Sequence, residues 1–140
     1  MTLKMAPVQV AAAVLTRAGN EFLLTQRPSG KVYAGYWEFP GGKIEAGETA
    51  QAALVRELEE ELGIVVERAV LWQTVCFSYP HAEVELHFFH VAVWRGEPYG
   101  REGQNIGWQT LETCRDLLLL PANHGVLKAL PGLLKGGAFS

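Results

Sequence analysis

The segment from Thr49 to Gly63 constrains the fold more than any other part of the chain, because its apolar residues have helical spacing. Leu54, Leu58 and Leu62 recur every four residues, which predicts an α-helix that packs one apolar face against a core. Thr49 is a favourable N-cap, and Gly63 is a typical helix stop. The fold must therefore supply a core on one side of this helix.

A second pattern in the same segment is acidic. Glu57, Glu60 and Glu61 stand at positions i, i+3 and i+4, so a helix places their carboxylates on one face. They lie toward the C-terminal end, where the helix dipole disfavours negative charge. A solvated acidic face is the alternative, and it would suffice for Glu59. A hard cation explains the other three better, because Mg²⁺ takes oxygen ligands and neutralises carboxylates that repel one another.

Three glycines, Gly41, Gly42 and Gly47, lie in the loop that leads into this helix. Glycine allows a tight turn or a close approach to a ligand. A simple strand-to-helix turn is the alternative. Because the loop precedes a helix N-terminus and lies beside the carboxylates, we expect it to expose backbone groups to a metal or a phosphate. Two roles stay open for Arg56 and Glu48: a structural ion pair that anchors the loop and the glutamates, or direct participation in the chemistry.

The remaining segments predict a mainly antiparallel sheet and further helices. Five segments and one position have strand character: Val8–Leu15 and Phe22–Thr25 as a buried hairpin, Tyr36–Pro40, Val70–Tyr79 with Val84–Trp94 as a long hairpin, and the region of Trp108. Leu111–Leu120 and Gly125–Leu130 are predicted as short helices separated by Pro121, and residues 131–140 as a loose tail. The expected fold class is α+β, arranged as an α/β/α sandwich.

Composition narrows the class of protein. A chain of 140 residues fits one domain, 1–140, and 49% hydrophobic residues provide a real core. The net charge of −3, with scattered Lys and Arg, argues against a nucleic-acid polymer as partner. Cys76 and Cys114 stand apart, without metal-binding or disulfide spacing, and no apolar run reaches membrane length. We therefore expect a cytoplasmic protein that does not contact membranes.

The acidic helix and its loop resemble the signature segment of a known family. The matching residues are Gly42, Glu48, Arg56, Glu57, Leu58, Glu60, Glu61, Gly63 and Ile64. They occupy every specified position of the Nudix box, G-x5-E-x7-R-E-U-x-E-E-x-G-U, where U is an aliphatic residue. The likeness runs from about Val8 to Leu130 and is greatest to the MutT-type members of the Nudix hydrolases, through the segments EFPGGKIEAGET, GEPYGREGQ and PAN.

This resemblance implies a Nudix-type sandwich with a mixed sheet, a central catalytic helix and a bound Mg²⁺, for which Mn²⁺ could substitute. The implied metal ligands are Glu57, Glu60, Glu61, Glu102 and the carbonyl of Gly41. Glu57 is also the candidate that handles the attacking water. Arg27, Phe39 and Asn123 would surround the base, with the Asn123 amide hydrogen-bonded to a purine edge. Taken singly, Arg27 could instead be a surface cation, Phe39 a core aromatic and Asn123 a helix cap.

The implied reaction is hydrolysis of an oxidised purine nucleotide such as 8-oxo-dGTP to the monophosphate and pyrophosphate, by a monomer or homodimer. A CTP or general nucleotide pyrophosphohydrolase is the nearest alternative. The chain departs from MutT-type members at Gln26, where they have arginine, and through Pro28–Tyr36. A nucleotide-binding Nudix module without catalysis is an alternative of another class, but the intact set of carboxylates argues against it.

Overall fold

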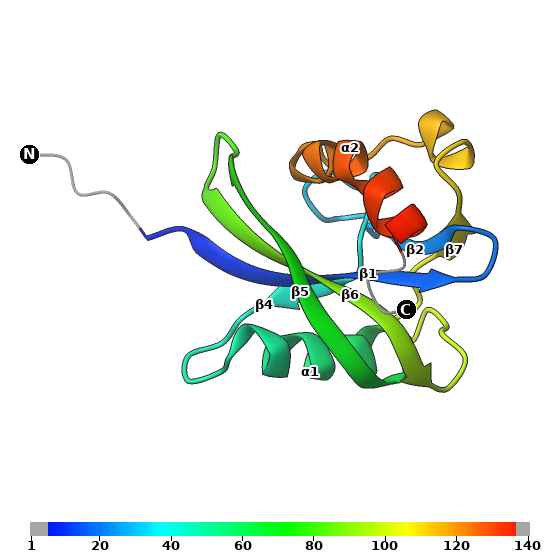
Figure 1. Ribbon diagram of the computed structural model, residues 1–140. Coiled ribbons are helices and arrows are strands. Elements are labelled where there is room, and N and C mark those ends of the chain that lie inside the picture. Colours follow the sequence, from blue (N-terminus) through cyan, green and yellow to red (C-terminus); the bar gives the residue numbers. More distant parts are fainter. Residues whose placement is uncertain (1–5, 137–140) are drawn as a thin grey trace, which may run out of the picture.

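A mixed β-sheet lies between two helices in the computed structural model, which describes residues 6–136 (Figure 1). This arrangement confirms the predicted α+β class and the α/β/α sandwich. The elements follow one another as β1 (Val8–Arg17), β2 (Glu21–Gln26), β3 (Trp37–Glu38), β4 (Gly41–Lys43), α1 (Ala50–Leu62), β5 (Val65–Ser78), β6 (Glu83–Arg95), β7 (Ile106–Gln109), the 3₁₀ turn η1 (Thr113–Asp116) and α2 (Pro121–Gly136).

Strand β1 is the centre of the sheet. It pairs in parallel with β6 from Val8 to Leu15, and antiparallel with β4 through Val10, Ala11 and Ala12. The predicted hairpin with β2 forms, but only two residue pairs join the strands, because β2 then turns away to pair with β3 and β7. The long β5–β6 hairpin is confirmed, and β5 begins at Val65 rather than at Val70. The parallel β1–β6 pairing was not predicted.

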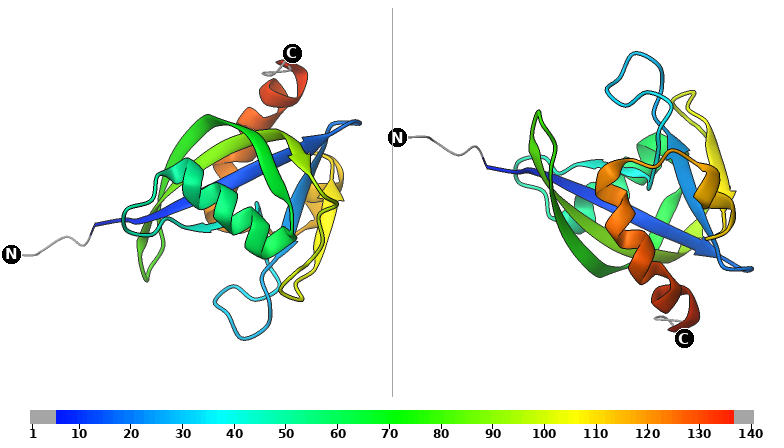
Figure 2. Two further views of the ribbon diagram at one scale, coloured as in Figure 1. Left: turned by 90° about the horizontal axis from the view of Figure 1, so that it is seen from below. Right: turned by 90° about the horizontal axis from the view of Figure 1, so that it is seen from above.

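The two faces of the sheet bury separate cores, and alternate residues of β1 contribute to each. Ala11, Ala13 and Leu15 pack toward α1, whereas Ala12 and Val14 pack toward α2. This explains why the N-terminal strand is apolar without interruption, since both of its faces are covered. Figure 2 shows the two helices crossing opposite faces of the sheet.

Helix α1 has the predicted limits. The Thr49 hydroxyl accepts a hydrogen bond from the Ala52 N–H at 3.1 Å, and Gly63 ends the helix in the left-handed conformation at φ 68°. Leu54, Leu58 and Leu62 are fully buried. The apolar face therefore fixes the helix against the sheet and leaves the carboxylates on a different face.

The C-terminal prediction was wrong in two respects. The segment Leu111–Leu120 contains only the short turn η1, and Pro121 begins α2 instead of separating two helices. Proline is tolerated in the first helical position, where its missing N–H would have no helical acceptor. The helix also continues through Pro131 to Gly136, because Leu130 and Leu133 are buried in the core, so the loose tail predicted from residue 131 is wrong for residues 131–136. Residues 137–140 lie outside the described residues.

Helix α2 is the longest helix of the described chain, and neither it nor α1 combines the length and the apolar character that a membrane crossing requires.

Two glycine substitutions should change stability in opposite directions. A Cβ on Gly41 would overlap the carbonyl oxygen of Ala11 and lie 2.7 Å from the Cα of Ala12, both rigid backbone atoms of β1. We expect Gly41→Ala to lower the free energy of unfolding by about 1–3 kcal/mol, as overpacking does. A Cβ on Gly132 in α2 meets no atom within 4 Å, so Gly132→Ala should raise stability by roughly 0.5–1 kcal/mol. Urea denaturation of both variants measures the changes, and equal changes would contradict the close β1–β4 packing.

Candidate active site

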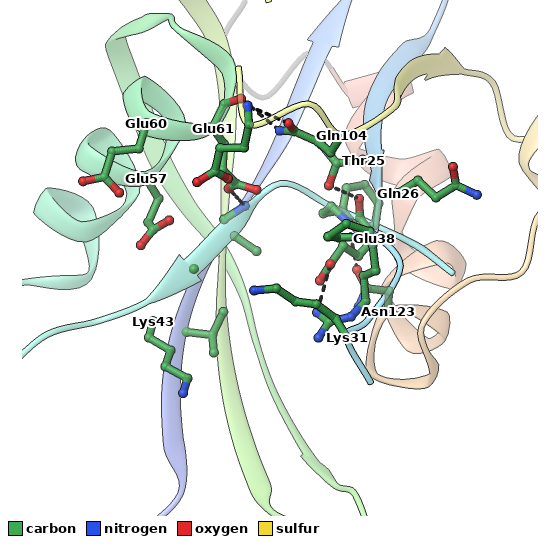
Figure 3. A pocket seen from close by; sticks show the side chains of 18 of the residues that line it. Thr25, Gln26, Lys31, Glu38, Lys43, Glu57, Glu60, Glu61, Gln104 and Asn123 are labelled. Carbon is green, nitrogen blue, oxygen red and sulfur yellow. Dashed lines mark hydrogen bonds and ion pairs between the residues drawn. The ribbon is translucent and has the colours of Figure 1, made fainter. Parts of the chain in front are cut away.

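A cleft of about 630 Å³ opens where β4 and α1 face the start of α2 (Figure 3). It contains every residue that the sequence predicted to bind metal or substrate: Arg27, Phe39, Gly41, Glu57, Glu60, Glu61, Glu102 and Asn123. The labelled side chains of α1 lie on one side of the view, and those of Glu38 and Asn123 lie on the other. We call these two regions the acidic end and, after the nucleobase that the resemblance implies there, the base end of the cleft.

The acidic end is built by α1 and the glycine turn. Glu61 accepts a hydrogen bond from the Gly41 N–H at 2.9 Å through its Oε2. Gly42 faces Glu57 so closely that a Cβ there would overlap the Glu57 carboxylate. The paired glycines therefore let the backbone lie directly against two of the predicted metal ligands, as expected from the sequence.

Burial sets the electrostatics of Glu61. Loss of solvent first, and then the nearby charges of Glu38, Glu57 and Glu102, raise the pKa of its carboxyl to about 8. The Gly41 N–H opposes this shift, because it stabilises the ionised form. The carboxylates around Glu61 thus repel one another, and the basic residues of the cleft do not neutralise them fully. A bound cation would relieve this repulsion.

Arg56 anchors the turn to the helix. Its Nε and Nη2 donate to the two carboxylate oxygens of Glu48 at 2.7 and 2.8 Å, and its Nη2 also reaches the Lys43 carbonyl at 3.1 Å. Its Nη1 donates to Glu57 at 2.8 Å and to Glu60 at 3.4 Å. The hydrogen bonds from Arg56, followed by that from a backbone N–H, lower the pKa of Glu48 to about 2. Of the two roles left open for Arg56 and Glu48, this geometry favours the anchor.

The acidic end fits a hard divalent cation by its chemistry. Its donors are carboxylate and backbone oxygens, which such ions prefer. Within residues 6–136, however, no three acidic, histidine or cysteine side chains already converge on one point. Glu57 and Glu60 are turned toward Arg56 instead. Closing a shell around an ion therefore requires these two side chains to rotate away from the guanidinium.

The base end combines charged and apolar groups. Arg27 is not a free surface cation: its Nη1 donates to Glu38 at 3.1 Å and its Nε donates to the Val32 carbonyl at 2.8 Å. The Phe39 ring is part of the core, with ring centroids 5.9 Å from Phe22 and 5.7 Å from Phe88. Phe39 thus meets the description of a core aromatic and still borders the cleft.

Asn123 is buried on the first turn of α2, so it is a helix residue and not the cap considered from the sequence. Its Oδ1 accepts a hydrogen bond from the Phe39 N–H at 3.1 Å. Within the described part of the chain its Nδ2 has no hydrogen-bond partner, which leaves that donor for a ligand.

Sequence analysis missed three charged residues in the cleft, Glu38, Lys31 and Lys43. Burial raises the pKa of Glu38, although the neighbouring Arg27 lowers it. A charged residue between the apolar Trp37 and Phe39 in a short strand was the available signal for Glu38. Lys31 lies in an irregular loop, and no local pattern distinguishes it from other exposed lysines.

The part of the chain that is similar to known proteins includes the residues at both ends of the cleft. A sequence model of the NUDIX domain matches residues 6–131. An 8-oxo-dGTP diphosphatase of Haemophilus influenzae is 48% identical over 123 residues, which cover 88% of this chain and 90% of the relative. A CTP pyrophosphohydrolase of Escherichia coli is 37% identical over 132 residues, which cover 92% of this chain and 95% of the relative. A solved structure from work on MutT of Aliivibrio salmonicida and Vibrio cholerae has a TM-score of 0.74 at 33% identity, covering 89% of this chain and 96% of that chain.

The raised pKa of Glu61 predicts a pH-dependent stability in the absence of metal. A carboxyl whose pKa is higher in the folded state stabilises the protein fully below pH 4.5, and this contribution disappears as pH rises through about 8. Glu61→Gln keeps a neutral acceptor for the Gly41 N–H and should remove the effect. We therefore expect the free energy of unfolding of the wild type, relative to Glu61→Gln, to decrease as pH rises from about 4.5 to about 8 and to level off above that.

Urea denaturation in the presence of EDTA measures this difference. Glu59→Gln, at an exposed position of the same helix, is the control and should follow the wild type. Parallel pH profiles for the wild type and Glu61→Gln would show that Glu61 is not the buried carboxyl inferred here.

Proposed function

This chain belongs to the NUDIX family, and on that premise we propose that it is a nucleoside triphosphate pyrophosphohydrolase whose preferred substrate is 8-oxo-dGTP. The observation that carries the proposal is the single cleft, with carboxylates for phosphate chemistry at one end and a buried amide donor at the other. The similarity to the 8-oxo-dGTP diphosphatase of Haemophilus influenzae supports the choice of substrate. The similarity to a CTP pyrophosphohydrolase makes CTP the second candidate.

We assign the acidic end to a divalent cation, Mg²⁺ in the first place, with Mn²⁺ as a substitute. Glu57, Glu60, Glu61, Glu102 and the Gly41 carbonyl would hold it. When bound, such an ion neutralises phosphate oxygens and lowers the pKa of a bound water. Because phosphoryl transfer depends mainly on charge neutralisation and alignment, no covalent intermediate with the protein is required.

Hydrolysis then forms one bond between water and a phosphorus atom of the chain and breaks one bridging P–O bond. The nucleoside monophosphate and pyrophosphate leave. We assign the removal of the water proton to Glu57, whose carboxylate lies against the glycine turn and is hydrogen-bonded to Arg56. Arg56, itself held by Glu48, positions Glu57 in this proposal. Lys43, on β4 in the same cleft, can attract the negative phosphate chain.

We assign the base end to recognition of the nucleobase. With Oδ1 occupied by the Phe39 N–H, the Asn123 Nδ2 can donate to a base carbonyl or ring nitrogen. Arg27, fixed by Glu38, and Phe39 would complete the walls. A guanine-type base offers such acceptors on one edge, and its 8-oxo form adds one more carbonyl.

Three further assignments stay predictions. We place the protein in the cytoplasm, where Cys76 and Cys114, both free thiols, would remain reduced. We expect no nucleic-acid polymer as partner, because the charged side chains of the cleft suit a small anionic ligand with a metal. We expect a monomer or a homodimer.

A nucleotide panel tests the substrate. We expect kcat/KM with Mg²⁺ to be about fivefold or more higher for 8-oxo-dGTP than for dGTP or CTP, since one additional hydrogen bond contributes roughly 1 kcal/mol or more. EDTA should abolish the reaction, and Mn²⁺ should restore it. A preference for CTP would select the second candidate, nucleotide binding without turnover would select a non-catalytic module, and turnover in EDTA would contradict the metal assignment.

Removal of one carboxylate tests the acidic end. Glu57→Gln should lower kcat by about 10²–10³-fold, because it removes a preorganised charge from the reacting centre. The matched control Glu59→Gln, two residues away on the same helix and exposed, should keep wild-type kcat. Circular dichroism and thermal denaturation check that both variants fold. Wild-type turnover in Glu57→Gln would refute the role given to Glu57.

A further inference from the structure

Tyr79 makes an unusual long-range contact with the start of α2. It follows the last residue of β5, at the turn of the β5–β6 hairpin. Its hydroxyl oxygen accepts a hydrogen bond from the Ala122 N–H at 3.0 Å, across 43 positions in the sequence. The hairpin turn is thereby tied to a helix on which a candidate substrate ligand, Asn123, lies.

This contact supplies a cap that α2 does not have in its own sequence. The first N–H groups of an α-helix have no acceptor within the helix and need another partner. In α2 the first residue, Pro121, has no N–H, and the Asn123 N–H is bonded to the Leu120 carbonyl at 2.9 Å. The Ala122 N–H is satisfied by Tyr79. The position of the first turn therefore depends on a side chain that is distant in sequence, from the turn of the β5–β6 hairpin.

The first turn of α2 sets the position of the Asn123 amide. Asn123 is only 3% exposed, and its side chain is held at one point by the Phe39 N–H. The position of the Asn123 side chain is fixed in addition by the Asn123 backbone, which directly follows Ala122 in the first turn of α2. A small shift of the first turn would move Nδ2 relative to the cleft without breaking the core.

The surroundings of Tyr79 hold its hydroxyl in place. Its ring contacts Phe77 at 4.8 Å, Tyr33 at 5.6 Å and His81 at 5.4 Å between centroids. Partial burial raises the pKa of the Tyr79 hydroxyl, so it remains a neutral phenol near neutral pH. The ring also borders a hollow of about 260 Å³, and Asn123 lines both this hollow and the main cleft.

We propose that Tyr79 is a positioning residue for base selectivity, and that its hydroxyl acts through the Ala122 N–H on the placement of the Asn123 amide. The selectivity part of this inference rests on the proposed function, whereas the positioning part is a property of the protein without ligand. Tyr79→Phe isolates the inference, because it removes one oxygen and keeps the ring and its contacts.

Nuclear magnetic resonance of the ligand-free protein tests the positioning. In Tyr79→Phe we expect hydrogen exchange of the Ala122 amide to accelerate by about fivefold or more, as loss of one hydrogen bond implies, and the Asn123 side-chain amide resonances to shift. Tyr36→Phe is the matched control, since the Tyr36 hydroxyl makes no hydrogen bond within residues 6–136. Unchanged exchange and unchanged Asn123 resonances in Tyr79→Phe would overturn the proposal.

A double-mutant cycle tests the route of action. The readout is the ratio of kcat/KM between the nucleotide that the wild type prefers and a second nucleotide. Tyr79→Phe should lower this ratio by about threefold to tenfold, which corresponds to roughly one hydrogen bond, and should lower it no further in an Asn123→Ala background. The same loss in both backgrounds would place the hydroxyl directly on the nucleotide and overturn the positioning role. An equal loss of kcat/KM for all nucleotides would show that Tyr79 has only a structural role, and would overturn the proposal.

These outcomes are separable from a failure of the proposed function. If the wild type hydrolysed none of the nucleotides, the proposed function would fail, and the exchange of the Ala122 amide would still decide whether Tyr79 holds α2 in place. Conversely, suppose that the wild type is selective and that Tyr79→Phe leaves the ratio of kcat/KM between the two nucleotides unchanged. This result would support the proposed function and refute the role given to Tyr79.

Discussion

The hydrogen bond from the Gly41 N–H to the Glu61 carboxylate fixes the relation between helix and sheet on which the whole site depends. Gly41 belongs to β4, which pairs with the central strand β1, and Glu61 lies in the last turn of α1. Buried leucines hold the adjacent face of the helix, so α1 cannot roll without losing core contacts. The carboxylates consequently face the cleft at a set depth, and the turn of glycines lies directly against them.

This arrangement opposes the stability of the helix itself. Helix α1 has no acidic residue in its first turn and no basic residue in its last turn, which is the reverse of what the helix dipole favours. It also buries Glu61 near other carboxylates, which raises the pKa of that group to about 8. Arg56 offsets part of the repulsion by binding Glu48 and Glu57. A helix selected for stability alone would not carry this distribution, and a Nudix hydrolase that recruits a cation to the same face explains it.

The parts of the site that could be predicted are those encoded by local spacing. Glu57, Glu60 and Glu61 meet on one face because i, i+3 and i+4 are neighbours on any helix, and capping by Thr49 and Gly63 is equally local. Pro121 was misassigned because proline is a breaker within a helix and also a favourable first residue, and only the burial of Leu130 and Leu133 distinguishes the two cases. The parallel β1–β6 pairing and the Tyr79–Ala122 contact join segments far apart in sequence, and no local pattern determines them.

This difference between local and distant contacts also separates hydrolysis from selectivity. The acidic end comes largely from one helix and the turn before it, so the chemistry survives as long as that short segment does. The base end is assembled from the residue after β2, from β3 and from α2, and Tyr79 of the β5–β6 turn contacts α2, so one substitution can reshape this end and leave the carboxylates in place. Gln26, where the sequence departs from MutT-type members, illustrates this: its Nε2 donates to the Gly35 carbonyl at 3.0 Å, and its Oε1 accepts from Asn105 at 2.9 Å. Because both ends of this amide are already used to hold the loop, any effect of Gln26 on the substrate proposed above would act through the position of that loop.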